Sequence, residues 1–449
     1  MKQLFFLSLA LLMFLNNETF SQDTQKVIMN PRERIKEKMN FQPKNAFNID
    51  EALKTKENQK TISLQNQNLE NLDKRLFEFY NLESLDLSNN ELKTLPEEFR
   101  NFKNLKILKI RNNKLQEIPK VLFDLPNLEL IDLSANQIKN ISIDFKSNLK
   151  KLNISDNKSE KIYINTPNNS LEELDISGSN FPIFNENLSN LKQLKVLNLS
   201  KSQIKSFGPN AALPKNLQKL ILNNNQLISF PELIFSLTSL QHLDISNNQI
   251  EKISFAKPLN IKSINISRNK LSNITFETTF NELNDLIAMQ QNSDVVNFNF
   301  ANISNLKSLN ISNNKLGKLE NADKLVNLES LDMSKTGLTD FPPLIKNPSK
   351  IKRLNLSFNQ ISKLPTNITE YTLLEQLQLT NNQISTIPAS VGQLTNLKYL
   401  MLDKNLLEDL PQELSNCKNL KMLSLRMNKF SDPTKEKITK LFPNIKITF

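Results

Sequence analysis

The sequence is poor in the residues that build most active sites and cross-links. It contains one cysteine (Cys417), one histidine (His242), five glycines and no tryptophan. A single cysteine excludes an intrachain disulfide. No glycine-rich loop could cradle a phosphate, and no histidine, cysteine and carboxylate side chains share the spacing of a metal site. We therefore expect no metal and no other cofactor.

Charge of one sign is not concentrated anywhere in the chain. The 57 basic and 46 acidic residues give a net charge of +11 and a pI of about 9.3, and they are interleaved along the whole length. Such mixing is typical of a solvated, mildly basic surface rather than of a track for phosphates. We expect no nucleic-acid partner.

The N-terminus carries an apolar run from Leu4 to Leu15, preceded by Lys2 and followed by polar residues. This order is typical of a secretory signal peptide, and the run is too short to span a bilayer core of roughly 30 Å. We therefore predict a signal peptide over 1–21, export to a periplasm, the cell surface or the medium, and no membrane span. A buried helix or a membrane anchor is the alternative.

The rest of the chain repeats one pattern, represented by LESLDLSNNELKTLPEEF from Leu82 to Phe99. Apolar residues at alternating positions predict a short, half-buried strand. An asparagine follows where the chain leaves the strand, and its amide can satisfy backbone groups of its own turn and of the adjacent unit. A later proline favours an extended return and then a turn of helix.

Seventeen such units follow one another at intervals of 21 to 23 residues. An opening unit carries Ile62 and Leu64, and the others begin at Leu82, Leu105, Leu128, Leu149, Leu171, Leu194, Leu217, Leu240, Ile261, Leu283, Leu306, Leu328, Ile351, Leu374, Leu397 and Leu420. Self-similarity at this period predicts a solenoid in which neighbouring units bury a continuous core.

The pattern LxxLxLxxNxL with its proline resembles the leucine-rich repeat family over about residues 59–449, and the LPxxFxxL tail resembles the Ras-suppressor type of repeat. The resemblance implies an α/β solenoid with a concave parallel sheet and a convex face of short helical, 3-10 and extended segments. It also implies a non-enzymatic protein-protein interaction module that binds its partner on the concave face.

Weaker patterns flank the repeats at 61–429. Residues 22–45 are predicted to be a flexible basic lead-in, 46–60 an N-terminal helical cap, and 430–449 a C-terminal cap with a helix, whose N-cap is Asp432, and a closing strand.

One repeat fits the pattern poorly. In the unit that begins at Leu283, either Leu286 and Ala288 or Ile287 and Met289 could face the core, because a one-residue shift exchanges the faces of a strand. We expect a structural irregularity there rather than a functional insertion.

Outward strand positions carry a polar ladder, for example Asp86 with Ser88 and Asn198 with Ser200. We interpret these as solvated positions rather than as a recognition strip or an ion site. The ladder creates sequons, including those at Asn198 and Asn310, and glycans there would block the sheet. This favours a bacterial over a eukaryotic secreted protein.

The ladder changes in the last units, where an aromatic residue, methionines and an arginine replace asparagine, aspartate and serine. Exposed apolar groups beside arginine are typical of binding hot spots. We therefore predict a partner-binding surface, the C-terminal patch, made of Phe358, Gln376, Gln378, Tyr399, Met401, Asp403, Met422, Arg426 and Met427. A weaker candidate consists of Ile107, Lys109, Arg111 and Leu130.

A catalytic cysteine–histidine pair would need Cys417 and His242, which lie seven to eight repeats apart. That separation corresponds to roughly 35–40 Å at the spacing of strands in a sheet, so the two side chains cannot meet. Cys417 occupies a core position of its repeat, and His242 is expected to be a solvated residue of the concave face. We predict no catalytic site.

The sequence thus favours an exported, monomeric module that binds a protein ligand. A glycan or cell-wall binding protein is the alternative, favoured by the polar ladder and the positive charge, and it predicts binding to purified polysaccharide. An intracellular signalling scaffold is a further alternative if the N-terminus is not a signal peptide.

Sequencing the N-terminus of the protein recovered from its cells tests the export prediction. We expect the mature chain to begin at Gln22, because Thr19 and Ser21 provide small residues before a cut. A protein that still begins at Met1 would favour the intracellular alternative.

Overall fold

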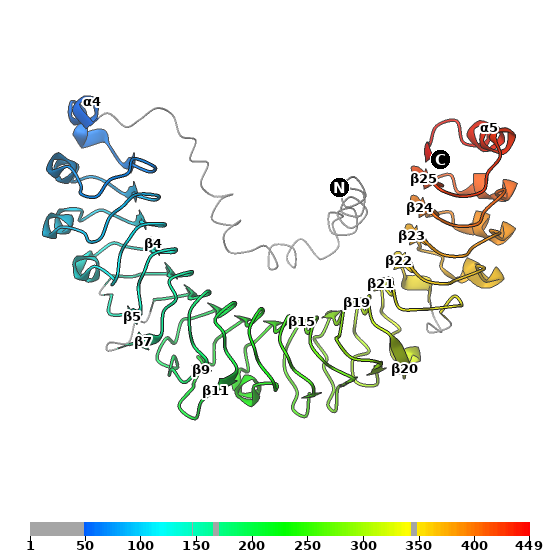
Figure 1. Ribbon diagram of the computed structural model, residues 1–449, viewed down its shortest axis with the longest axis horizontal. Coiled ribbons are helices and arrows are strands. Elements are labelled where there is room, and N and C mark those ends of the chain that lie inside the picture. Colours follow the sequence, from blue (N-terminus) through cyan, green and yellow to red (C-terminus); the bar gives the residue numbers. More distant parts are fainter. Residues whose placement is uncertain (1–48, 146, 165–169, 343–347) are drawn as a thin grey trace. The chain divides into compact units, whose positions relative to one another are not determined.

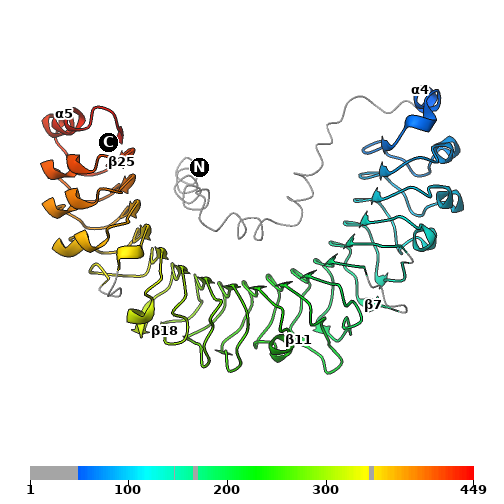
Figure 2. The same cartoon turned by 180° about the vertical axis from the view of Figure 1, so that it is seen from behind.

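The computed structural model describes residues 49–449 except 146, 165–169 and 343–347. Residues Ile49–Phe449 form one compact unit, shown from opposite sides in Figures 1 and 2. The predicted signal peptide, the predicted lead-in and the first residues of the predicted N-terminal cap lie outside the described residues.

Within the described residues, eighteen strands form one parallel sheet in chain order, and each strand pairs with those of the neighbouring repeats. The strands are β1 (Thr61–Ser63), β2 (Ser84–Asp86), β3 (Ile107–Lys109), β4 (Leu130–Asp132), β6 (Lys151–Asn153), β8 (Glu173–Asp175), β10 (Val196–Asn198), β12 (Lys219–Ile221), β13 (His242–Asp244), β15 (Ser263–Asn265), β17 (Asp285–Ile287), β19 (Ser308–Asn310), β21 (Ser330–Asp332), β22 (Arg353–Asn355), β23 (Gln376–Gln378), β24 (Tyr399–Met401), β25 (Met422–Ser424) and β26 (Lys446–Thr448). The first seventeen belong to the predicted repeats, and β26 is the predicted closing strand.

The register of the sheet stacks equivalent residues of successive repeats. Leu85 pairs with Leu108 and Leu108 with Ile131, and all three side chains are fully buried. Each three-residue strand is too short to be stable alone, so its stability comes from two neighbours and from the leucine layer beneath it. The sheet lines the inner side of the curved array of repeats (Figure 1), as the solenoid prediction requires.

Short 3-10 helices form much of the outer side. Six of them begin directly after a proline in an extended conformation, because proline fixes its own φ and cannot continue a ladder of backbone hydrogen bonds. These six are η3 (Glu97–Asn101), η4 (Lys120–Asp124), η5 (Glu232–Ser236), η8 (Thr366–Glu370), η9 (Ala389–Gln393) and η10 (Gln412–Asn416). The others in the described repeats are η2 (Lys74–Glu78), η6 (Ala322–Lys324) and η7 (Pro348–Lys350).

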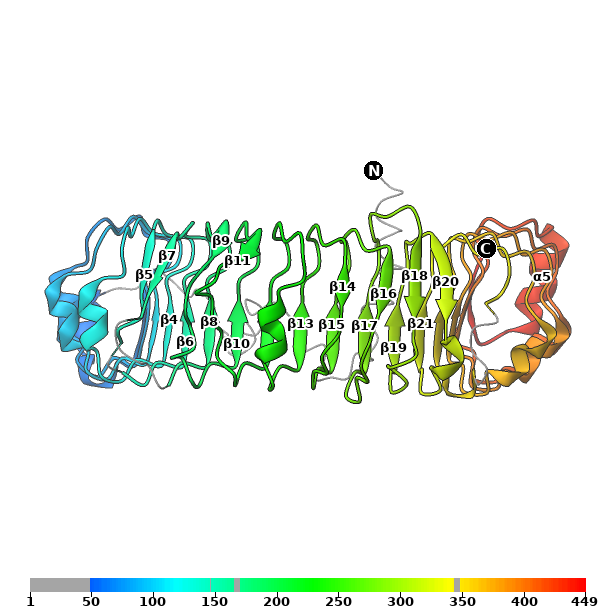
Figure 3. The same cartoon turned by 90° about the horizontal axis from the view of Figure 1, so that it is seen from below.

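Repeats in the middle of the chain have extended outer segments instead, which pair into small parallel sheets. Figure 3 shows these short strands on the outer side. They are β5 (Asn140–Ser142) with β7 (Lys161–Tyr163), β9 (Ile183–Phe184) with β11 (Ser206–Phe207), and the series β14 (Ile253–Ser254), β16 (Asn273–Thr275), β18 (Val296–Asn299) and β20 (Leu316–Glu320). Phenylalanines fill the space beneath them; the rings of Phe255 and Phe276 stack with centroids 4.7 Å apart.

The irregular repeat beginning at Leu283 has one clear register. Leu286 and Ala288 are buried, whereas Ile287 and Met289 are half-buried on the opposite face. Pairing of β17 with β15 and β19 imposes this choice, because Leu286 aligns with Ile264 and Leu309.

Helices stand at both ends of the described unit. The first are α4 (Ile49–Leu53) and η1 (Lys56–Asn58), and α5 (Asp432–Leu441) precedes β26. The N-cap prediction for α5 is wrong by one residue: Ser431, not Asp432, caps the helix, and its side chain accepts a hydrogen bond from the Thr434 backbone. The division into domains stays a prediction.

A ladder of asparagines holds the repeats together from inside. The amide nitrogen of Asn90 donates to the carbonyls of Leu64 and Leu87 at 2.8 and 2.9 Å, and its oxygen accepts from the backbone of Gln67 and Leu69. One side chain thereby links its own turn to the preceding repeat. The same bonds recur from Asn113 to Asn428, which confirms the predicted role of the asparagine.

Leu356→Ala tests the layered core. Leu356 is fully buried, and truncation leaves a cavity that neighbouring repeats cannot fill, so we expect a loss of about 2–5 kcal/mol in the free energy of unfolding. Urea unfolding measures this change in the free energy of unfolding. Ser362→Ala, a substitution at an exposed position of the same repeat, is the control. A loss well under about 1 kcal/mol for Leu356→Ala would contradict the inward register.

Candidate functional site

The single thiol is a core group. Cys417 is 2% exposed, and its sulfur donates to the Val391 carbonyl at 3.4 Å. Burial raises the pKa of the thiol to about 11, so the sulfur stays protonated and is not a nucleophile near neutral pH. The prediction of a buried structural cysteine is confirmed.

The single histidine lies in the middle of the inner sheet on β13. It is half-buried rather than solvated as the sequence suggested, because strands on both sides cover the ring, and its Nδ1 has no hydrogen-bond partner. Burial, with smaller effects of Lys219 and Lys262, lowers the pKa of His242 to about 4. Two strands further along, burial raises the pKa of Asp285 to about 6, against the opposing effect of Lys307.

No metal-binding cluster is found in the described part of the chain, where no three histidine, cysteine or carboxylate side chains are grouped to hold an ion. None of the described helices has both the length and the apolar character needed to cross a membrane.

Part of the polar ladder of the inner face is buried rather than solvated as we expected, while other members, such as Asp175 and Asn310, are half-buried. Asp86 and Ser88 are 7% and 8% exposed, and Asp132 and Ser134 are equally buried. The aspartate oxygen accepts from the serine backbone two residues on, at 3.0 Å for Asp86. Neighbouring strands cover these short side chains, which therefore fix the turn rather than present a recognition strip.

The strands of the C-terminal patch present larger side chains. Tyr399 pairs with Met422 across β24 and β25, and Met401 follows on β24. All three are half-buried on the inner face. Met401 lies in the row of the polar ladder, aligned through Gln378 and Asn355 with Asp332, whereas Tyr399 and Met422 lie in the neighbouring outward row, aligned with Arg353 and Ser330.

Two residues of the predicted patch lie below the surface. Gln376 and Gln378 are 4% and 7% exposed, so neither is available as a direct contact. Gln376 pairs with Arg353 on one side and Tyr399 on the other, and these longer side chains cover it.

Asp403 has a structural role within the patch. Its two carboxylate oxygens accept from the Ser424 hydroxyl at 2.6 and 2.8 Å, and one also accepts from the Arg426 backbone at 2.8 Å. These bonds order the turn after β25, which carries the exposed side chains of Arg426 and Met427.

Phe358 and Met427 are the most unusual residues of the patch. Both sit at the turn after a strand with φ of 59° and 57°, in the left-handed region that bulky side chains disfavour. Polar residues such as Asn89 and Asn247 hold most equivalent positions. The two apolar side chains are 39% and 71% exposed, so packing does not explain them.

The sequence interpretation missed two neighbours of the patch. Leu406 is 41% exposed at a turn position that holds Glu91 and Lys114 in earlier repeats, and this contrast was available in the sequence. Arg353 lies half-buried on β22 beside Gln376. Burial lowers the pKa of its guanidinium from the ordinary value.

The weaker candidate is spread over β3 and β4. Ile107 and Leu130 pair there and are half-buried, while the Lys109 ammonium lies 3.9 Å from the Asp86 carboxylate. Arg111 is exposed at the following turn.

His242→Gln tests the burial of the histidine. In the unfolded chain the imidazole takes up a proton near pH 6.5, but in the folded protein only near pH 4. The unfolded state therefore binds more protons between these values, and stability falls as the pH drops from 7 to 5. Urea unfolding at both pH values should show a smaller loss for His242→Gln than for the natural chain; an equal loss would contradict the buried, neutral ring.

Two family models match the chain. The model described as leucine-rich repeat matches residues 58–115, 103–158 and 372–430, and the model described as leucine-rich repeats in two copies matches residues 215–258 and 304–346. Together they cover more than half of the sequence. A comparison with curated proteins finds no match.

Solved structures show the same architecture. A leucine-rich repeat protein of Leptospira interrogans is 26% identical, with a TM-score of 0.71 over 91% of this chain and 100% of that chain. YopM of Yersinia enterocolitica is 23% identical, with a TM-score of 0.55 over 88% of this chain and 94% of that chain. The repeated motif, the inner parallel sheet and these matches agree, and the chain belongs to the leucine-rich repeat family.

Proposed function

We propose that the protein is an exported interaction module that binds a partner protein through its C-terminal patch. Leucine-rich repeat proteins are in general interaction modules rather than enzymes, and no catalytic family matches this chain. The observation that carries the proposal is the group of three large, half-buried side chains, Tyr399, Met401 and Met422, at outward positions of two adjacent strands.

The turns beside these strands extend the surface. Phe358, Leu406 and Met427 are exposed there, and two of them have a backbone conformation that is costly for their residue type. A cost that the fold does not require is typical of residues retained for contact. Arg353 and Arg426 lie next to the apolar groups, and aromatic residues and arginine are enriched in binding hot spots.

The rigid scaffold lowers the entropic cost of binding a partner. Both neighbours of each strand and the asparagine ladder fix the backbone beneath the patch before any partner arrives, so association orders few additional groups. Gln376, Gln378 and Asp403 contribute by supporting the exposed side chains. We propose that the protein acts as a monomer and that residues 1–21 direct its export.

A second candidate function, glycan binding, is favoured by a polar groove at the turns of the first repeats. The groove has a volume of about 450 Å³ and is lined by Asn66, Asn68, Asn89, Asn90, Glu91, Asn112, Asn113, Lys114 and Gln137. Amide side chains can donate to and accept from sugar hydroxyls. This candidate predicts binding to purified cell-wall polysaccharide in the absence of protein.

A pull-down from envelope and host extracts with residues 22–449 tests the main proposal. We expect a protein band that is lost with Tyr399→Ala, Met401→Ala and Arg426→Ala combined, because truncating hot-spot residues weakens binding by roughly 2 kcal/mol or more.

The matched control combines Lys151→Ala, Asn153→Ala and Glu173→Ala, which alter equivalent rows of β6 and β8. A band retained by the patch variant and lost by the control would contradict the site. Capture of no protein, together with binding to polysaccharide, would favour the glycan alternative.

A further inference from the structure

One junction between repeats is open on the outer side of the solenoid, between the repeats of β19 and β21. At most other junctions the first outer apolar residue is sealed in the core, as Leu92 and Leu115 are at 1% and 0% exposure, although Leu69 of the opening repeat is half-buried. At this junction Leu316, Leu319 and Leu338 are all half-buried. We call this place the open junction.

The backbone is also unpaired there. At closed junctions the N–H after the asparagine turn donates to the outer leucine carbonyl of the preceding repeat, as from Lys114 to Leu92 at 2.9 Å. Gly337 occupies that position in the repeat of β21, and among the described residues no backbone hydrogen bond joins it to Leu316. Its φ of +80° turns the chain in a way that favours glycine.

The result is a strand with a free edge. β20 is the last member of the outer sheet β14–β16–β18–β20, and it pairs with β18 on one side only among the described strands. It is also the longest strand described, with five residues. A free edge presents backbone donors and acceptors that another extended chain can pair with.

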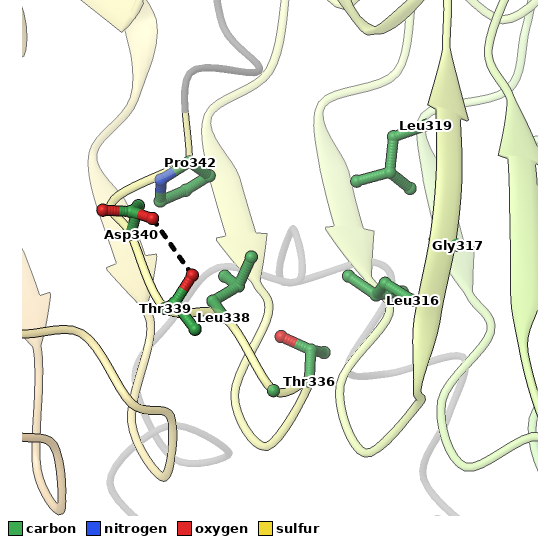
Figure 4. Close-up of a pocket in the computed structure, with 9 residues that line it drawn as sticks. Leu316, Gly317, Leu319, Thr336, Leu338, Thr339, Asp340 and Pro342 are labelled. Carbon is green, nitrogen blue, oxygen red and sulfur yellow. Dashed lines mark hydrogen bonds between the residues drawn. The ribbon is translucent and has the colours of Figure 1, made fainter.

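A cleft of about 270 Å³ separates β20 from the facing segment. Figure 4 shows Leu316 and Leu319 on the β20 side and Leu338, Thr339, Asp340 and Pro342 on the other. Gly317 also lines the cleft, although a side chain there would meet Asn297 and Val295 on the β18 side. The cleft has room for one large side chain between apolar walls.

Charges of both signs are exposed beside the cleft, because β20 carries Lys318 as well as Glu320 and the facing segment carries Asp340. Asp340 is exposed there and accepts from the Thr339 hydroxyl at 3.0 Å. Glu320 is exposed at the end of β20 and accepts from the Asn299 amide at 3.1 Å. Asp340 is the charged residue that lines the cleft, and a cationic residue of a ligand is complementary to its carboxylate.

We propose that the open junction binds an extended peptide segment of a partner protein. The segment adds as a further strand to the edge of β20, places one large apolar side chain among Leu316, Leu319 and Leu338, and sets a lysine or arginine beside Asp340. Strand addition of this kind takes affinity from main-chain hydrogen bonds and specificity from side-chain pockets. The site lies on the outer side and does not depend on the C-terminal patch.

Selection of short random peptides displayed on phage against the full chain tests the proposal. We expect the selected peptides to share one large apolar residue next to lysine or arginine. A synthetic copy is then titrated by fluorescence anisotropy, and N-methylation of alternate backbone amides should abolish binding at those amides that pair with β20 and leave the others unaffected.

Two exposed substitutions locate the site. Thr339→Trp fills the cleft and should lower affinity about tenfold or more, because the apolar anchor loses its pocket. Asp340→Lys should lower it about two- to fivefold, as expected for an exposed ion pair. Gln116→Trp and Glu117→Lys make the same changes at equivalent positions of a closed junction and should leave affinity within about twofold.

Several results would overturn the proposal. These are a lack of enriched peptides, equal binding to Thr339→Trp, and insensitivity to N-methylation. Light scattering that shows a dimer lost with Thr339→Trp would make the cleft an interface between two copies.

Discussion

The side-chain amide of the repeated asparagine sets the geometry on which the rest of the structure depends. Two asparagines in successive repeats donate to the same carbonyl: Asn90 and Asn113 both bind the Leu87 oxygen, at 2.9 and 3.0 Å. Each amide also receives a backbone N–H from the preceding repeat, as Asn113 does from Leu92. A buried backbone group left without such a partner costs about 1–3 kcal/mol. The segment from strand to asparagine therefore has a fixed length, and variation between repeats falls in the outer segments.

This constraint determines where the molecule can vary its surface. Leucines fill the core, asparagines close the turns, and inner-face aspartates such as Asp86 and Asp132 accept from the backbone N–H two residues on, so few positions are available for contacts. We therefore propose that binding sites arise where the repeat departs from its pattern. The C-terminal patch departs in its side chains, since Met401 takes a position of the polar ladder and Tyr399 and Met422 bring large side chains to the neighbouring outward row. The open junction departs from the pattern in its backbone, since the Leu316 carbonyl accepts no backbone hydrogen bond from Gly337 of the next repeat.

The sequence predicted the secondary structure, which depends on adjacent residues. It missed side-chain burial and strand register, which depend on the neighbouring repeats. Alternating leucines and the proline of each repeat predicted the strands and the 3-10 helices, because these depend on a few adjacent residues. The exposure expected for Gln376 was wrong, since Arg353 and Tyr399 flank it, and the solvated ladder was wrong for its buried members such as Asp86 and Asp132. The choice between Leu286 and Ile287 was open in the sequence and is fixed by strand pairing. Leu406 could have been found by comparing turn positions, whereas the open junction depends on the path of two repeats and has no local signal.

Site-specific photo-cross-linking on the intact chain tests the central claim, that residues departing from the repeat pattern on the last strands contact the partner. A photoreactive phenylalanine derivative replaces Tyr399 or Met427 in two variants, and Asn153 or Glu173 in two controls on β6 and β8. After irradiation in envelope and host extracts, we expect one protein to be cross-linked from positions 399 and 427 and none from 153 and 173. Cross-links from the control positions alone, or equally from all four, would contradict the account.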